Sequence, residues 1–465
     1  MAVTLVWFRR DLRVMDHPGL RAAADAGPTV CLFVVDTTLL RRRHHRAPPR
    51  LRFLRAGLEE LDRELRERGS RLVIRSGAPS RVVPEVAAEA GAARVTWQRE
   101  VSPWGRARDE RVRRALERDR IEVVETGGDL VAELDDVPGS SGDGYLVFTP
   151  FHRAWREVPL PSHVPAPSEI GGPRLGGDGL DLLPDGDPPL EAGPRAARRR
   201  LVAFIRDGGA DAYPDRRDDP AADATSHLSA YLRLGMCTGP QIGRALGLPD
   251  RLSRGREAFW RQICWREFYH HHLARHPEVA RVSLNRSLRA VEWDDEPTDL
   301  AAWARGETGI PIVDAGMRQL AETGWIHNRA RMVVASFLVK DLLVDWRRGE
   351  TVFMQGLVDG DPANNNGGWQ WTAGTGTDAA PYFRVLNPVR QAKRFDPDGD
   401  YVRRYVPELR DVPATRIHEP WRMTEEEQRG AGCRLGSDYP APRVDHHERR
   451  ELMLERYRRS REAAG

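Results

Sequence analysis

Short runs of Val, Ile, Leu and Thr alternate with amphipathic stretches through the first 150 residues. The runs predict strands at residues 3–8, 29–36, 71–76, 94–98 and 122–125. Between them, residues 49–68 place leucines at helical spacing with a charged opposite face, and residues 79–91 and 106–119 follow the same pattern. This alternation indicates a parallel sheet covered by helices, so we predict an α/β domain over residues 1–150.

The pattern changes after residue 150. Residues 159–195 hold nine prolines and seven glycines, which indicates a linker without regular elements. Beyond it, β-type runs are nearly absent. Helices are expected over residues 191–204, 239–246, 257–275, 298–305, 313–323, 328–344 and 350–357. We therefore predict an interdomain linker over 151–195 and an all-α domain over 196–465.

Composition narrows the functional classes. The chain has 72 Lys and Arg residues and 69 Asp and Glu residues, which gives a formal net charge of +3. This near balance excludes a protein that binds nucleic acid over a uniformly basic surface, but it allows a local basic patch. Only two basic residues are lysines, Lys340 and Lys393. The arginines occur throughout the chain, so we interpret their excess as the mark of a GC-rich genome rather than of phosphate recognition.

The cysteines and the apolar runs indicate the compartment. Four dispersed cysteines form no CxxC pair, so we expect a reducing environment and neither a disulfide framework nor a metal site. No apolar run approaches the roughly 20 residues that span a bilayer. The N-terminus resembles no signal peptide. We expect a cytoplasmic protein without a membrane contact.

The first strand is followed by WFRRDLR where a dinucleotide-binding domain has GxGxxG, so a standard dinucleotide site there is not expected. The densest polar stretch is residues 359–387, which combines Asn, Gly and Trp. It reads as a loop, either exposed and flexible or ordered around a ligand, and its tryptophans favour the second.

Three further groups carry candidate chemistry. Tyr213 is followed by hydroxyl residues near a predicted helix start, which could bind a pyrophosphate or simply cap the helix. Asn328 and Met332 lie one helical turn apart. Nine of the 13 tryptophans lie in the second half, where they could fill a core or relay electrons. The histidines 270–272 predict only a partly exposed helix face.

The motifs together resemble one family. WFRRDLR, WREFY, GIPIVDAGMRQL, WIHNRARM, SFLVKDLLVDWRRGE, DGDPANNNGGWQW and GTDAAPYFRVLNP are similar to those of photolyases and cryptochromes, over nearly the whole chain, and most similar to class I cyclobutane pyrimidine dimer photolyases. The resemblance implies an α/β antenna domain and a helical domain that binds FAD and UV-damaged DNA. It implies light-driven electron donation from reduced FAD to a dimer flipped out of the DNA. We expect a monomer.

The resemblance also implies roles for residues. Those expected to bind FAD are Tyr213, Thr225, Ser226, Leu228, Ser229, Trp260, Arg266, Asn328, Arg331, Asp359, Asp361 and Asn365. Asn365 would face flavin N5, where a neutral amide suits a reduced anionic flavin. Those expected to contact the dimer or DNA phosphates are Arg217, Trp265, Arg329, Met332, Trp371 and Arg384, with Asn328 also lining the lesion pocket. Trp369, Trp346 and Trp293 would carry electrons to the flavin.

Two positions leave alternatives open. Gln262 stands where dimer photolyases usually have Glu, and photolyases for (6-4) photoproducts commonly have Gln; those enzymes, however, place histidines where this chain has Asn328 and Met332. A cryptochrome-like photoreceptor is the other alternative, although we expect a longer C-terminal extension in that class.

The resemblance also implies a second, antenna chromophore. The candidate contacts are Arg50, Glu100 and Asp109, and 8-hydroxy-5-deazaflavin is favoured over folate or FMN. Alternatively, Arg50 and Asp109 are ordinary solvated helix charges.

Overall fold

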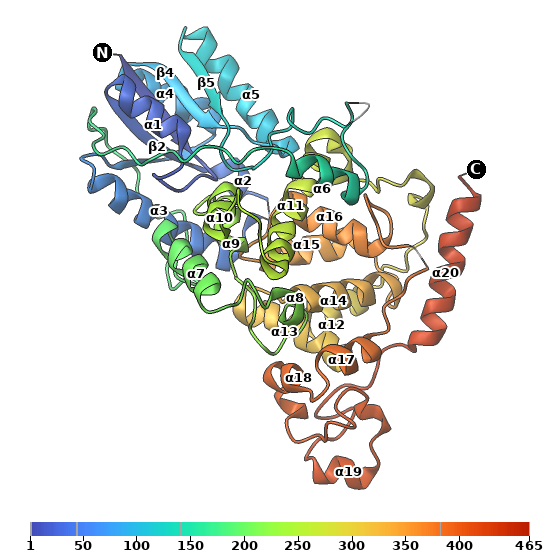
Figure 1. Ribbon diagram of the computed structural model, residues 1–465. Helices are drawn as coiled ribbons and strands as arrows, with labels where there is room; N and C mark the ends of the chain where they lie inside the picture. The colour runs from blue at the N-terminus through green and yellow to red at the C-terminus, as the bar shows by residue number, and fades with distance from the viewer. Residues whose placement is uncertain (1, 43–44, 140–141, 382, 465) are drawn as a thin grey trace. The chain divides into compact units, whose positions relative to one another are not determined.

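The computed structural model describes residues 2–42, 45–139, 142–381 and 383–464 (Figure 1). The chain divides into two compact units. Unit 1 comprises Met1–Tyr213, Ser226–Pro277 and Val358–Ala363, and unit 2 comprises Pro214–Thr225, Glu278–Leu357 and Asn364–Gly465. These units are defined by internal contacts, and the domain boundaries at residues 150 and 195 stay a prediction.

Unit 1 is built on a parallel five-stranded sheet. Its strands are β1 (Val3–Phe8), β2 (Thr29–Asp36), β3 (Leu72–Gly77), β4 (Ala92–Gln98) and β5 (Glu122–Thr126), in the order β3-β2-β1-β4-β5. The predicted strands are confirmed, with small shifts at the ends of β3, β4 and β5. The central strands are buried along most of their length, as their continuous apolar sequences require.

Helices cover this sheet. The first five are α1 (Pro18–Ala26), α2 (Thr37–Leu40), α3 (Pro48–Arg66), α4 (Pro79–Ala90) and α5 (Pro103–Arg118). Most start with a proline in the first turn, where its missing N–H is not needed. Apolar residues such as Val83, Val86 and Val112 pack on the sheet and form one core with it. The remaining helices are α6 (Phe148–Arg156), α7 (Pro194–Arg206), α9 (Ser229–Arg233), α10 (Gly239–Leu246) and α11 (Arg254–Arg275).

The Pro- and Gly-rich linker is tied to the α/β sheet by backbone hydrogen bonds. Residues 159–193, all of them described, contain no helix or strand, as predicted. Thr29 N donates to Gly171 O at 2.7 Å, and Asp178 N donates to Ile74 O at 2.7 Å. A side chain at Gly172 would meet the Thr29 carbonyl at 2.2 Å, so glycine is required for this close approach. The linker thus pairs with part of the β3 edge.

Unit 2 is helical. Its elements are η2 (Pro277–Ala280), η3 (Arg286–Leu288), α12 (Pro297–Arg305), α13 (Pro311–Thr323), α14 (Asn328–Lys340), α15 (Trp346–Gly356), α17 (Pro388–Phe395), α18 (Asp400–Tyr405), η4 (Pro407–Leu409), η5 (Pro420–Arg422), α19 (Glu425–Gly430) and α20 (His446–Glu462). The helices α8 (Tyr213–Arg216) and α16 (Pro362–Ala373) begin in unit 1, as does η2 at its first residue. The α/β and all-α fold classes are confirmed.

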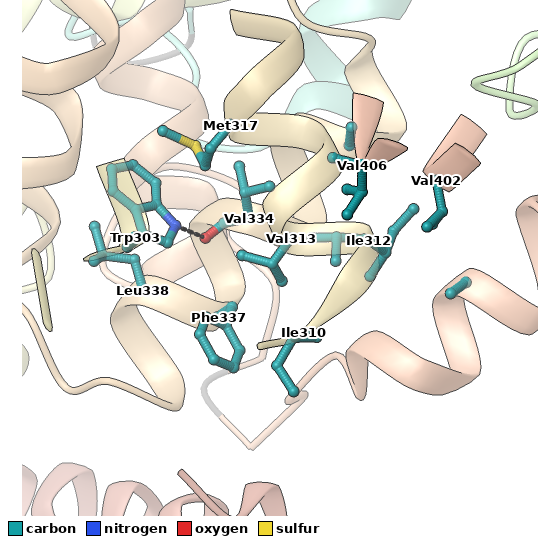
Figure 2. Close-up of a cluster of buried hydrophobic side chains, with 14 of the residues drawn as sticks. Trp303, Ile310, Ile312, Val313, Met317, Val334, Phe337, Leu338, Val402 and Val406 are labelled. Atoms are coloured by element: carbon teal, nitrogen blue, oxygen red, sulfur yellow. Dashed lines mark hydrogen bonds between the residues drawn. The ribbon is translucent and has the colours of Figure 1, made fainter. Parts of the chain in front are cut away.

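The core of unit 2 gathers around Trp303, which is fully buried (Figure 2). Its indole N–H donates to the Val334 carbonyl at 2.9 Å, so the polar atom of this large side chain is satisfied inside the core (Figure 2). No helix in the described part of the chain is long and apolar enough to span a membrane.

The expectation of a loop over residues 359–387 is wrong for its first half, because α16 occupies Pro362–Ala373. Its Asn and Gly residues have poor helix propensity, but tertiary hydrogen bonds override it. The amide of Gln370 donates to Val279 O at 3.0 Å and accepts from Leu284 N at 3.0 Å. Asn366 also donates to Val279 O, at 3.1 Å. The same amides that made the segment look like a loop hold the helix in place.

Candidate functional site

One face of α14 carries Asn328, Met332, Ser336 and Lys340 at intervals of four residues, so the four side chains form a stripe. The last three line a cavity of about 200 Å³ within unit 2. The prediction that Asn328 and Met332 lie one helical turn apart on one face is confirmed, and the Asn328 amide lies 3.9 Å from the Met332 sulfur.

The cavity combines an aromatic wall with a strongly basic lining. Its other lining residues are Asp218, Arg329, Trp371, Thr372, Ala380, Arg384, Leu386, Gln391, Arg394 and Phe395. Three arginines and Lys340 therefore face one carboxylate, Asp218. Such a lining favours an anionic ligand with a flat apolar part.

Arg329 is held in a fixed position in this lining. Its guanidinium pairs with Asp218 at 2.8 Å and lies 4.1 Å over the Phe395 ring. Of the predicted lesion and DNA residues of unit 2, the structure thus brings Arg329, Met332, Trp371 and Arg384 around one cavity. Arg217, which is half-buried, does not line it.

Asn365 is oriented by the neighbouring helix α15. Its amide N–H donates to the Glu350 carbonyl at 3.0 Å, and the next residue, Asn366, donates to the Glu350 carboxylate at 3.3 Å. Burial raises the pKa of Glu350 to about 7. Sequence reasoning missed Glu350, because nothing in its local pattern shows that it meets α16.

The three tryptophans of the expected electron path belong to one core region of unit 2: Trp369 and Trp346 lie in the same buried cluster, and Trp293 packs against it. Trp369 packs edge-on against Trp303 with ring centroids 6.0 Å apart, and the Trp346 indole N–H lies 3.4 Å from Ser283 Oγ. Trp293 lies 6.2 Å from the Tyr457 ring. Among the described residues, no ring contact joins Trp369 to Trp346 or Trp346 to Trp293, so the path stays a prediction.

In unit 1, helices α6 and α11 each contribute one ring to a stacked aromatic pair. The Trp265 indole lies parallel to the Phe148 ring, with centroids 3.6 Å apart. Gln262, one turn earlier, donates from its amide to the Ala258 carbonyl at 3.3 Å. Trp260 is buried against Trp155, with centroids 4.8 Å apart.

The three histidines of α11 are buried, so the prediction of a partly exposed helix face is wrong. The reason is that they find partners: the His271 ring lies 2.9 Å from Ala132 O, and the His270 ring lies 3.1 Å from Asp361. Asp361 also pairs with Arg10. Burial opposes ionisation, but His270 and Arg10 outweigh it and hold the pKa of Asp361 well below its usual range.

Two family models match long segments of this chain. Residues 4–168 match the family model of DNA photolyase, and residues 259–459 match that of the FAD binding domain of DNA photolyase. The chain is 41% identical to a deoxyribodipyrimidine photo-lyase of Halobacterium salinarum, over 98% of this chain and 99% of that protein. The chain belongs to the DNA photolyase family.

Solved structures agree with this family assignment. A class III photolyase from Agrobacterium tumefaciens superposes with a TM-score of 0.93 at 38% identity, over 99% of this chain and 98% of that one. A cryptochrome from Synechocystis superposes with a TM-score of 0.90 at 29% identity, over 98% and 99% of the two chains. Photolyases and a cryptochrome thus share this fold, so the fold alone does not separate the two functions.

The residues of this photolyase-family chain are compatible with a bound FAD, because two buried hydrogen-bond donors have no acceptor in the described part of the chain. The Thr225 hydroxyl in unit 2 and one terminal nitrogen of Arg266 in unit 1 are buried without a hydrogen-bond partner in the described part of the chain. The other terminal nitrogen of Arg266 donates to Leu232 O at 3.2 Å. Buried donors of this kind suit an anionic pyrophosphate or a flavin carbonyl.

The other predicted FAD residues are placed as follows. Tyr213 packs edge-on against Phe259, with centroids 5.3 Å apart. Ser226 Oγ accepts from Leu228 N at 3.4 Å, and α9 begins at the next residue, Ser229. Asp359 is buried, and Arg331 donates to Ile326 O at 2.8 Å.

Arg50 and Asp109 are buried, so the alternative that they are solvated helix charges is wrong, and Glu100 is half-buried. Asp109 forms ion pairs with Arg9 and Arg108. Glu100 accepts from Val101 N at 3.0 Å and Ser102 N at 3.1 Å.

Glu100 alone of the three lines a narrow cleft of about 40 Å³ that follows the carboxyl ends of β1, β4 and β5. Burial opposes its ionisation, but Arg10 and neighbouring arginines outweigh it and lower the pKa of Glu100 to about 2. Its carboxylate is therefore already engaged by the chain itself.

Proposed function

We propose that this chain is a deoxyribodipyrimidine photo-lyase, which uses light and reduced FAD to split cyclobutane pyrimidine dimers in UV-damaged DNA. The observation that carries the proposal is the cavity of unit 2, where Trp371 and Met332 meet a ring of arginines. A pyrimidine dimer on a DNA strand has the matching chemistry: flat apolar bases flanked by phosphates.

Different residues of this cavity would contact the bases and the phosphates of the damaged DNA. The Trp371 indole offers a stacking surface for a base, and the Met332 thioether packs against apolar edges. Arg329 and Arg384, together with Arg217, would contact phosphates, which makes binding salt-dependent and largely independent of sequence. The dimer must leave the duplex to enter, and its weakened pairing lowers that cost.

FAD supplies the photoexcited electron donor when it is bound in its reduced form. The chain's part is to bind and orient it. The buried donors of Arg266 and Thr225 would hold its anionic or carbonyl groups. One N–H of the Asn365 amide donates to the Glu350 carbonyl, and this bond orients the side chain that, by the family resemblance, would face flavin N5.

The remaining FAD-binding roles come from the family resemblance. They concern Tyr213, Ser226, Leu228, Ser229, Trp260, Asn328, Arg331, Asp359 and Asp361. By the same argument, Trp369, Trp346 and Trp293 would carry electrons to the cofactor. In unit 1, Trp265 would stack on a dimer base. Gln262 would donate an amide hydrogen bond to a dimer carbonyl, although it cannot supply a proton.

We also propose a second, light-harvesting chromophore of the 8-hydroxy-5-deazaflavin type, with folate or FMN less favoured. Its support is the cleft at the carboxyl ends of the parallel strands, the usual ligand position in such sheets. Glu100 lines that cleft, whereas Arg50 and Asp109 do not. Absorption and mass spectra of the chromophores released from purified protein test the proposal.

Repair of a defined lesion tests the function. Reduced protein is mixed with UV-irradiated oligothymidine and exposed to blue light, and recovery of absorbance at the thymine band is compared with a dark control. We expect light-dependent recovery with dimer substrate and none with a (6-4) photoproduct. Absence of dimer repair by protein with bound, reduced FAD would favour a cryptochrome-like photoreceptor or, if the second substrate is repaired, a (6-4) photolyase.

A further inference from the structure

Lys340 is a buried lysine at the end of helix α14, with 1% of its surface exposed. It stands on the stripe that carries Met332, and it lines the same cavity. Its ammonium donates to the main-chain carbonyl of Arg384 at 2.7 Å. Among the described residues, this carbonyl is the one hydrogen-bond acceptor of the Lys340 ammonium. The bond therefore joins α14 directly to the segment that carries Arg384.

The rarity of lysine makes this position informative. The chain has 72 basic residues, of which only Lys340 and Lys393 are lysines. Lys393 is different in kind, because its side chain is 54% exposed and pairs with Glu419 on the surface. Where arginine replaces lysine almost everywhere, a buried lysine marks a place that needs a compact ammonium rather than a wide planar guanidinium.

The segment that Lys340 contacts is irregular, and an apolar contact also holds it, because Val385 packs against the cluster that includes Leu288 and Leu343. Residues 383–387 form neither helix nor strand, and Phe383 is 60% exposed. The local backbone bonds are Arg384 N to Pro381 O at 2.8 Å and Val385 N to Phe383 O at 3.1 Å. Both bonds join residues only two or three positions apart in the chain, so neither fixes the segment to the helices around the cavity.

We propose that Lys340 is a positioning residue for DNA binding: by holding the Arg384 carbonyl against α14, it fixes the Arg384 guanidinium at the rim of the lesion cavity. The inference rests on the proposed function, in which Arg384 contacts a DNA phosphate. Fixing the backbone of Arg384 before DNA arrives removes an ordering cost from binding.

The polar groups that line the cavity near Lys340 agree with this role. Ser336, one turn before Lys340, has a buried hydroxyl without a partner in the described part of the chain. The cavity therefore offers a second polar group beside Lys340. Burial lowers the pKa of Lys340 to about 8, and at neutral pH the ammonium still carries the proton that the bond requires.

Three variants test the proposal. Lys340→Met keeps the length of the side chain but removes the donor and the charge. Lys340→Arg keeps the charge but not the compact shape, and Lys393→Met is the matched control at the exposed lysine. Each is compared with the wild type in FAD content, in amide hydrogen exchange of residues 383–387 without DNA, and in affinity for a thymine-dimer oligonucleotide at several salt concentrations.

We expect Lys340→Met to retain FAD, to exchange the amides of residues 383–387 faster, and to bind the dimer oligonucleotide about tenfold more weakly. The salt slope should fall by about one, as for a lost phosphate contact. Lys340→Arg should resemble Lys340→Met, and Lys393→Met should match the wild type. Should Lys340→Met lose FAD, Lys340→Gln, which keeps a donor, is measured in its place, with partial effects expected.

Unchanged exchange in Lys340→Met would overturn the link between Lys340 and the segment. Faster exchange with unchanged DNA affinity and salt slope would overturn the positioning role. A Lys340→Arg variant identical to the wild type would overturn the need for an ammonium. Failure of the proposed function is a separate result, because it appears as absence of repair by the wild-type protein.

Discussion

The Phe148 ring lies flat on the Trp265 indole, with centroids 3.6 Å apart and planes 4° apart. The Arg261 guanidinium lies 5.1 Å over the Phe148 ring, so the three groups form one stack. Phe148 itself is buried at the start of α6. One face of Trp265 is thereby covered, and only the other remains for a ligand base.

This stack predicts that Phe148 keeps Trp265 in the orientation needed for stacking. Phe148→Leu keeps apolar bulk but removes the flat ring, so we expect dimer-DNA affinity to fall several-fold and Trp265 to become more mobile. Aromatic pairs of this kind contribute about 0.5–1.5 kcal/mol beyond area burial. The measurement is dimer-oligonucleotide affinity beside tryptophan fluorescence anisotropy; Phe148→Tyr, which retains the ring, serves as the control. Equal affinity in the leucine variant would contradict the role.

Trp371 gives a sharper prediction for the lesion itself. Trp371→Ala removes the stacking wall of the cavity, and base stacking on an aromatic side chain contributes about 1–3 kcal/mol. We therefore expect about a 10- to 100-fold loss of affinity for dimer-containing DNA, little change for intact DNA, and normal FAD content. A gel-shift titration with paired damaged and intact oligonucleotides measures the ratio. Unchanged discrimination between the two would count against Trp371 as a lesion contact.

The sheet could be predicted from the sequence because buried parallel strands are continuous apolar runs, as β2 shows along Thr29–Asp36. Helix α16 could not, because its Asn and Gly residues are held by partners far away in the sequence. Gln370, for example, reaches Val279 and Leu284. Local propensity carries no information about such contacts.

The candidate site was likewise predicted only in part from the sequence. Motif resemblance identified Arg329, Met332, Trp371 and Arg384, which the structure brings around one cavity. It passed over Lys340, although that residue stands in a quoted motif, because its importance lies in one contact with the Arg384 carbonyl. A sequence motif shows which chemical groups lie along one helix or strand. A hydrogen bond to a backbone carbonyl far away in the sequence, such as that of Arg384, is visible only in the three-dimensional structure.

The ion pair of Arg10 and Asp361 predicts a loss of stability on removal of the carboxylate. Asp361→Asn would leave the partly exposed Arg10 guanidinium with Glu100, 3.5 Å away, as its remaining carboxylate, and would remove the charge beside His270. Because one carboxylate partner remains, we expect a loss of about 1–3 kcal/mol. Chemical denaturation measures the loss, and the exposed pair Arg206–Asp207 gives the control, since Asp207→Asn should change stability little. A small effect of Asp361→Asn would mean that the pair is not needed for folding.

Glu350 predicts a pH dependence of stability. Burial raises its pKa to about 7 in the folded protein, above that of the unfolded chain, so folding favours the protonated form. Its stabilising contribution is complete below about pH 4.5 and is lost as the pH rises towards 7. We expect Glu350→Gln, which stays neutral and can still accept the Asn366 hydrogen bond, to lose about 2–3 kcal/mol less than the wild type over this range. Urea unfolding at several pH values, with Glu426→Gln at an exposed position as control, measures the difference, and parallel curves for wild type and Glu350→Gln would show that Glu350 titrates normally.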